Sequence, residues 1–139
     1  MNLSIRNQLP GTVSTVTHGE VMAVVKLRLD GGRTLTAAVT REAVRDLGIE
    51  PGSAVRALIK STEVSLATGV VTGLSIRNQL PGTVTEVAVG GAMASVKAAV
   101  EGTVLTSAIT RDAVADLELG AGSSVVALIK STEISLAVA

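Results

Sequence analysis

The chain repeats itself, and this duplication restricts its fold more than any other feature of the sequence. Residues 4–13 and residues 75–84 both read SIRNQLPGTV. Residues 57–67 read ALIKSTEVSLA and residues 127–137 read ALIKSTEISLA, so the two segments differ at one position. Two copies of one unit predict two structurally similar domains arranged in tandem.

The spacing of the repeats indicates where the two domains meet. The offset between matching segments falls from 71 residues in the first block to 70 in the second, so the first copy contains one extra residue. We place this residue near Gly31 and Gly32, where a turn is predicted. Residues 68–73 hold two Gly and two Thr around a Val pair, as a linker would. We therefore predict one domain at residues 1–69 and the other at residues 70–139.

The hydrophobic pattern of each copy is typical of β-strands. Residues 21–29 alternate between two faces with a period of two, and the Asp-Gly-Gly sequence that follows predicts a hairpin turn. Further strands are predicted at residues 33–39, 54–60 and 64–67. Pro10 and Gly11 are expected to interrupt the first strand as a bend or bulge.

One short helix is predicted in each copy. Thr40 is a suitable N-cap for residues 41–47, and Gly48 follows the end of that helix. Thr110 has the same position before residues 111–117. Five strands and one short helix per copy predict an all-β chain of two tandem OB-like five-stranded barrels.

The composition restricts what the core can contain. The chain has no Phe, Tyr, Trp or Cys, so the core must be aliphatic, and disulfides and thiolate metal sites are excluded. Halves of about 70 residues bury little surface alone, so we expect them to pack together and the chain to oligomerise. No apolar run approaches the roughly 18 residues of a membrane span. No secretory signal is visible, and we predict a cytoplasmic protein without a membrane partner.

Polar residues that occur in both copies indicate a possible oxyanion site. In the first copy they are Ser4, Arg6, Asn7, Gln8, Lys60, Ser61 and Thr62. A tetrahedral dianion accepts hydrogen bonds and donates none, so hydroxyls, backbone amides and cations suit it. The helix start at Thr40 would add backbone N–H groups. The alternative that these residues are polar strand ends and solvated charges remains open on this reasoning alone.

Catalysis and cation binding have little support in the sequence. His18 is the only histidine, and Val89 takes its place in the second copy, so neither a general base nor a site for a free metal cation recurs. Met22 and Met93 alternate within strands and are interpreted as core residues. Nucleic-acid-binding OB modules use aromatic platforms and basic grooves, whereas this chain has no aromatic residue and no net charge. We predict a binding protein that is not an enzyme.

The SIRNQLPGTV block closely resembles the Mop family of molybdenum-binding proteins, which open with a Ser-Ala-Arg-Asn-Gln-type block. The resemblance extends over nearly the whole chain, twice, and includes the AVT and AIT segments, the Pro51-Gly52 turn and the ALIKS strand ends. Two copies with nothing else attached are similar to the two-domain molybdate storage proteins. The resemblance implies an OB-like fold, a homotrimer, and molybdate or tungstate held between subunits for storage and homeostasis.

The resemblance also implies which residues bind the oxyanion. In the two copies these are Ser4, Ile5, Arg6, Thr40, Lys60 and Ser61, and Ser75, Ile76, Arg77, Thr110, Lys130 and Ser131. Ile5 and Ile76 replace the usual Ala and contribute only backbone N–H groups. Met22 and Met93 fall where relatives have a polar residue near the three-fold axis, which puts additional axial sites in doubt. The alternative functions are an OB-fold nucleic-acid-binding module and a non-catalytic partner subunit of a transporter or regulator.

Overall fold

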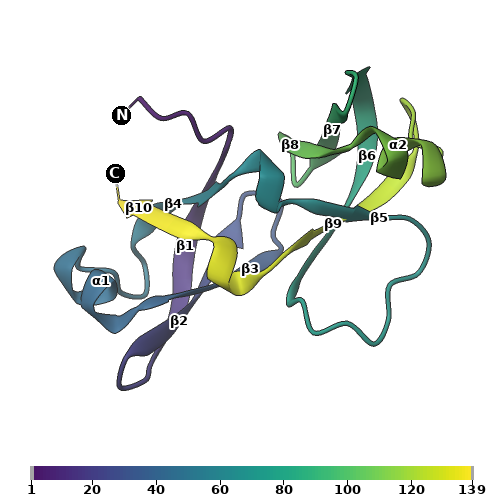
Figure 1. Ribbon diagram of the computed structural model, residues 1–139. Helices are drawn as coiled ribbons and strands as arrows, with labels where there is room; N and C mark the ends of the chain where they lie inside the picture. Colours follow the sequence, from purple (N-terminus) through teal and green to yellow (C-terminus); the bar gives the residue numbers. More distant parts are fainter. Residues whose placement is uncertain (1, 139) are drawn as a thin grey trace.

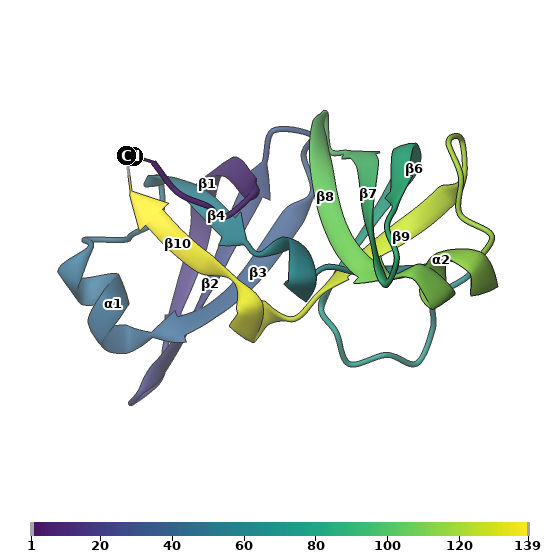
Figure 2. The same ribbon diagram turned by 45° about the horizontal axis from the view of Figure 1, so that its top comes forward.

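The computed structural model describes residues 2–138, which form two curled five-stranded antiparallel sheets with short helices between strands (Figures 1 and 2). The first sheet has the order β10-β4-β1-β2-β3, with β1 Asn7–His18, β2 Met22–Leu29, β3 Thr34–Thr40, β4 Ala54–Ile59 and β10 Ser135–Val138. The second has the order β5-β9-β6-β7-β8, with β5 Ser65–Ala67, β6 Asn78–Val89, β7 Met93–Val100, β8 Thr103–Thr110 and β9 Ser124–Ile129. The α-helices are α1 Arg41–Asp46 and α2 Arg111–Asp116, and the 3-10 turns are η1 Ser61–Glu63 and η2 Ser131–Glu133. The predicted all-β, tandem OB-like architecture is confirmed.

The β2–β3 and β7–β8 hairpins explain the one-residue difference between the repeats. In the first repeat the Leu29 N–H donates to the Arg33 carbonyl, so three residues form the turn between Leu29 and Arg33, and Gly32 has a φ of +95°. In the second repeat Glu101 and Gly102 alone form the turn, both with positive φ. A two-residue turn with two positive φ values is the type I′ geometry that suits the twist of a hairpin. The extra residue therefore lies where the sequence predicted it.

Pro10 and Gly11 do not interrupt the first strand, and this prediction was wrong. Both residues lie inside β1 and keep their register with β4, opposite Arg56 and Val55. The irregularity against β2 comes later, between Val13 and Thr15. Pro10 lacks only the N–H group, so it is tolerated where that group has no strand partner.

The fifth strand of each sheet comes from the other repeat. β10 pairs with β4 of the first sheet, whereas β5 pairs with β9 of the second. Figure 1 shows β10, in yellow, crossing from the second repeat to lie against β4. The sheets therefore do not consist of one repeat each, and the boundary between residues 1–69 and 70–139 stays a prediction.

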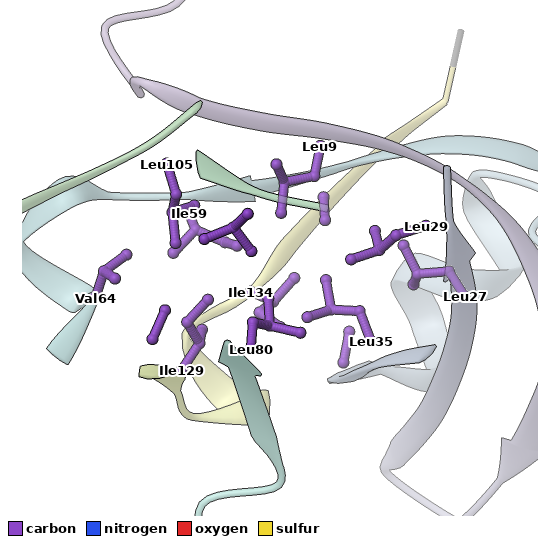
Figure 3. Close-up of a cluster of buried hydrophobic side chains, with 14 of the residues drawn as sticks. Leu9, Leu27, Leu29, Leu35, Ile59, Val64, Leu80, Leu105, Ile129 and Ile134 are labelled. Carbon is purple, nitrogen blue, oxygen red and sulfur yellow. The ribbon is translucent and has the colours of Figure 1, made fainter. Parts of the chain in front are cut away.

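The strand exchange produces one aliphatic core instead of two. Figure 3 shows Leu9, Leu35 and Ile59 of the first repeat in one cluster with Leu80 and Ile134 of the second. All five side chains are buried. Burying a side chain of this size contributes about 1.5–3 kcal/mol. Each half lacks aromatic residues, and sharing the core gives both halves more buried apolar area than either has alone.

Met22 and Met93 are not core residues, contrary to the sequence interpretation. Their exposed fractions are 43% and 48%. The period-two pattern was correct, because Ala23, Val25 and Leu27 are buried on the other face of β2. The methionines therefore belong to the outer face of their strands.

Candidate functional site

Two buried asparagines connect the repeats next to the candidate site. Asn7 Nδ2 donates to the Thr106 carbonyl at 2.8 Å, and the Thr106 N–H donates back to Asn7 Oδ1 at 2.8 Å. Asn78 makes the same pair of bonds to Thr36 and donates a third bond to the Ile129 carbonyl at 3.1 Å. Each asparagine thus pairs with the backbone of β3 or β8 as a neighbouring strand would. The sequence indicates Asn7 as a possible donor for an anion, but its side-chain amide is hydrogen-bonded to the backbone of Thr106.

The β1–β4 ladder brings the two sequence blocks together. Asn7 lies opposite Ile59, so the residues before Asn7 and those after Ile59 leave the ladder at the same end. Asn78 and Ile129 have the same relation in the second repeat. Strand pairing alone therefore places residues 4–6 beside residues 60–62.

A cavity of about 200 Å³ lies between these two segments. It is lined by Ser4, Ile5, Arg6, Lys60, Ser61 and Thr62. Five of these six residues are predicted site residues, and two of them are cations. The lining contains no carboxylate, so the cavity suits a small anion.

Ser61 and its counterpart Ser131 provide the clearest sign of a ligand. The hydroxyl oxygens of both residues are buried, and within residues 2–138 neither has a hydrogen-bond partner. A buried hydroxyl that remains unpaired costs about 1–3 kcal/mol, so buried polar groups are normally satisfied. The same unsatisfied hydroxyl in both repeats indicates that a molecule outside the chain supplies the partner.

The segment before β1 is held in shape by its own side chains. Arg6 Nε donates to the Ser4 carbonyl at 3.1 Å, and Gln8 Nε2 donates to the Ile5 carbonyl at 3.2 Å. These bonds connect both side chains to the backbone of residues 4–5. Arg77 and Gln79 make the corresponding bonds in the second repeat, so both copies of the segment have the same internal support.

Thr40 and Thr110 have a different role from the other predicted site residues. Thr40 Oγ1 accepts the Ala43 N–H at 3.1 Å, and Thr110 Oγ1 accepts the Ala113 N–H at 3.1 Å. These bonds confirm both threonines as N-caps. Thr40 does not line the cavity with Lys60, and Figures 1 and 2 show α1 at one end of the molecule.

Thr62 lines the cavity, although the resemblance to Mop proteins does not imply it as a site residue. Its signal in the sequence was the KST triplet at residues 60–62, which recurs at residues 130–132. A third hydroxyl-bearing residue beside Lys60 adds another possible donor for an anion.

Comparison with known proteins assigns the family. Residues 3–66 and residues 74–136 each match the TOBE domain. The chain belongs to the TOBE domain family. The two matches agree with the tandem repeat and leave only a short stretch between them. None of the helices in the described part of this TOBE chain is long and apolar enough to cross a membrane.

Named relatives of this TOBE chain confirm the resemblance to Mop proteins. The chain is 37% identical to the molybdenum-pterin-binding protein MopB of Rhodobacter capsulatus, a match over 99% of this chain and 52% of MopB. It is 34% identical to the molybdenum transport protein ModE of Herbaspirillum seropedicae, again over 52% of that protein. The chain thus spans about half the length of these two relatives. Molybdenum-pterin-binding protein 3 of Clostridium pasteurianum is 41% identical over 48% of this chain and 97% of its own length.

A solved structure shares the whole two-repeat arrangement. The crystal structure of the cytoplasmic molybdate-binding protein ModG, with molybdate bound, matches with a TM-score of 0.97 and 41% sequence identity. The match covers 100% of both chains. This TOBE chain therefore has the complete fold of ModG, including the path of both repeats.

Proposed function

We propose that this chain binds molybdate reversibly, at one cavity in each repeat, and serves to store and buffer the oxyanion. The observation that carries the proposal is the pair of buried, unpaired hydroxyls at Ser61 and Ser131. Ser61 lines the cavity with Arg6 and Lys60, and Arg77 and Lys130 hold the equivalent positions around Ser131. Tungstate has the same charge and tetrahedral shape, so we expect it to bind as well.

The residues of the cavity fit a tetrahedral dianion. Lys60 and Arg6 provide positive charge, and Ser4, Ser61 and Thr62 provide hydroxyl donors. The four oxygens of molybdate need donors on several sides, and the two chain segments that line the cavity can supply them. The residues of the second repeat equivalent to the six that line this cavity are Ser75, Ile76, Arg77, Lys130, Ser131 and Thr132. The names of the relatives support molybdenum as the element of the bound oxyanion.

We propose that the cavities are completed by neighbouring copies in a homotrimer. Thr40 does not line the cavity with the other predicted residues of the first repeat, so a second copy would have to bring the helix start to the anion. Apolar side chains are available for such contacts, because Val21 is 73% exposed and Val89 is 53% exposed. Light scattering on the purified protein is expected to give the mass of three chains, and a monomer would contradict this part of the proposal.

The remaining properties follow from a role in binding alone. We propose that the protein acts in the cytoplasm, without catalysis and without a nucleic-acid or membrane partner. The absence of aromatic residues and the net charge of zero support the absence of a nucleic-acid partner. A gel shift at low salt is expected to show no complex with single-stranded nucleic acid, because phosphate contacts would require a basic surface.

Equilibrium dialysis with labelled molybdate tests the proposed site. Lys60→Ala and Lys130→Ala should each weaken one of the two cavities by about 10-fold or more, since a bond to a charged donor contributes about 1.5–3 kcal/mol. Lys26→Ala is the matched control, because it removes the same charge from β2 outside the cavity. Unchanged binding in Lys60→Ala and Lys130→Ala would show that the site is elsewhere.

Competition experiments test the choice of anion. Sulfate is also a tetrahedral dianion, so charge cannot distinguish it from molybdate. Selectivity must therefore come from the size of the cavity. Molybdate and tungstate are expected to displace labelled molybdate at lower concentrations than sulfate. Equal displacement by sulfate would contradict selectivity for molybdate and leave a general oxyanion-binding protein.

A further inference from the structure

The two repeats support the turns that contain Ser61 and Ser131 in chemically different ways. The 3-10 turn η1, which begins at Ser61, packs against β8 of the second repeat, whereas η2 packs against β3 of the first. Ser107 on β8 is 1% exposed, and its hydroxyl donates to the Val64 carbonyl at the end of η1. The counterpart of Ser107 on β3 is Ala37, which has no hydroxyl to donate to Ile134.

The two supports differ at two contacting positions, one in the turn and one in the strand beside it. The turn η1 is supported by Val64 with Ser107, and the equivalent positions at η2 are Ile134 and Ala37. All four side chains are buried, and Figure 3 shows Val64 and Ile134 in the shared core. Ser107 has a hydroxyl that Ala37 lacks, and Ile134 has a methylene that Val64 lacks. The two pairs therefore have similar total volume. One is hydrogen-bonded and the other is apolar.

The hydrogen bond of Ser107 connects to the unpaired hydroxyl through one residue. The Val64 N–H donates to the Ser61 carbonyl at 3.4 Å, while the Val64 carbonyl accepts from Ser107. Holding Val64 therefore restricts the turn that carries Ser61. A donor held in place before binding loses less conformational freedom when the anion arrives, and this raises affinity.

We propose that Ser107 positions Ser61 and makes the first cavity bind molybdate more tightly and release it more slowly than the second. The inference rests on the proposed function, because it concerns the same two cavities. One additional hydrogen bond predicts a difference of about 2- to 10-fold in the release rate. Ser107 acts through the backbone of Val64 and does not touch the anion.

Chains with a single intact cavity allow the two release rates to be measured separately. Lys130→Ala leaves the first cavity intact, and Lys60→Ala leaves the second. Each chain is loaded with labelled molybdate, and the release of label into excess unlabelled molybdate is followed. We expect the Lys130→Ala chain to release its molybdate about 2- to 10-fold more slowly than the Lys60→Ala chain.

Exchanging the supporting pairs then identifies the cause. Ser107→Ala with Val64→Ile should speed release from the Lys130→Ala chain and leave the Lys60→Ala chain unchanged. Ala37→Ser with Ile134→Val should slow release from the Lys60→Ala chain. A role of Ser107 in stability alone would change both chains alike, and thermal melting of each variant measures that effect separately.

The outcomes distinguish this inference from the function on which it rests. Equal release rates from the two single-cavity chains, or an equal effect of the Ser107 exchange on both, would overturn the inference while leaving molybdate binding intact. Failure of the unsubstituted chain to bind molybdate would overturn the proposed function and the inference together.

Discussion

Replacement of Asn7 by Ala would remove a bridge between the repeats and leave its partners unpaired. The side chain of Asn7 is 1% exposed and makes two bonds of 2.8 Å to the backbone of Thr106. Each bond contributes about 1 kcal/mol net, and the unpaired N–H and C=O groups of Thr106 add about 1 kcal/mol more. We expect Asn7→Ala to lower the free energy of unfolding by about 3 kcal/mol.

The expected loss corresponds to a measurable change in melting temperature. An unfolding entropy of about 2.1 cal/mol/K per residue gives about 0.3 kcal/mol/K for a chain of 139 residues. A loss of about 3 kcal/mol therefore lowers the Tm by about 10 °C. Calorimetry at one fixed protein concentration measures this change, because association would otherwise shift the Tm.

Two further variants test how much each side-chain hydrogen bond contributes to stability. Asn78 donates one bond more than Asn7, to the Ile129 carbonyl, so Asn78→Ala should cost about 1 kcal/mol more. Gln8→Ala is the neighbouring control and should cost about 1 kcal/mol or less, since Gln8 is only half-buried. A loss of less than 1 kcal/mol in the free energy of unfolding for both asparagine variants would refute the view that these amides hold the repeats together.

Three further predictions concern a turn, a strand and a helix cap. Gly31→Ala would place a methyl group against Glu101 Oε2, so calorimetry should show a loss of about 1–3 kcal/mol that largely disappears when Glu101→Asn is added. Gly82→Ala would bring a Cβ within 2.7 Å of a β7 carbonyl oxygen and should also cost about 1–3 kcal/mol, whereas Gly120→Ala, with open space around it, should be close to neutral. Thr110→Ala removes the hydroxyl that caps α2 and should lower the free energy of unfolding by about 1 kcal/mol in urea denaturation.

Local features of the fold could be predicted because short sequence patterns determine them. The alternation of residues 21–29, the Asp-Gly-Gly turn and the Thr40 cap depend on neighbours within a few positions. Each prediction agrees with the structure. Pro10 is the exception, because whether a missing N–H matters depends on the strand beside it, which the sequence does not identify.

The strand exchange could not be predicted from the sequence. Residues 65–67 and 135–137 both read SLA, so either segment has the side chains needed to pair with β4 or β9. Register depends on the alternation of side chains, and this is the same for both pairings. The connections and the shared core select the exchanged arrangement, and these are properties of the whole chain.

The candidate site was only partly predictable for a related reason. The recurrence of Lys60 and Ser61 identified polar residues of interest, and strand pairing brings them to Ser4 and Arg6. The role of Asn7 in joining the repeats depends on a contact 99 residues away in the sequence. Its polar side chain therefore wrongly indicated a donor for the anion. The unpaired Ser61 hydroxyl is visible only once the packing around it is known.

A crystal of the protein grown with molybdate provides the most direct measurement of the central claim. Molybdenum scatters anomalously, so each bound oxyanion would appear as a separate peak. The account predicts one peak within hydrogen-bond distance of Ser61 Oγ and another beside Ser131 Oγ. Peaks elsewhere only, or no peak at saturating molybdate, would contradict it.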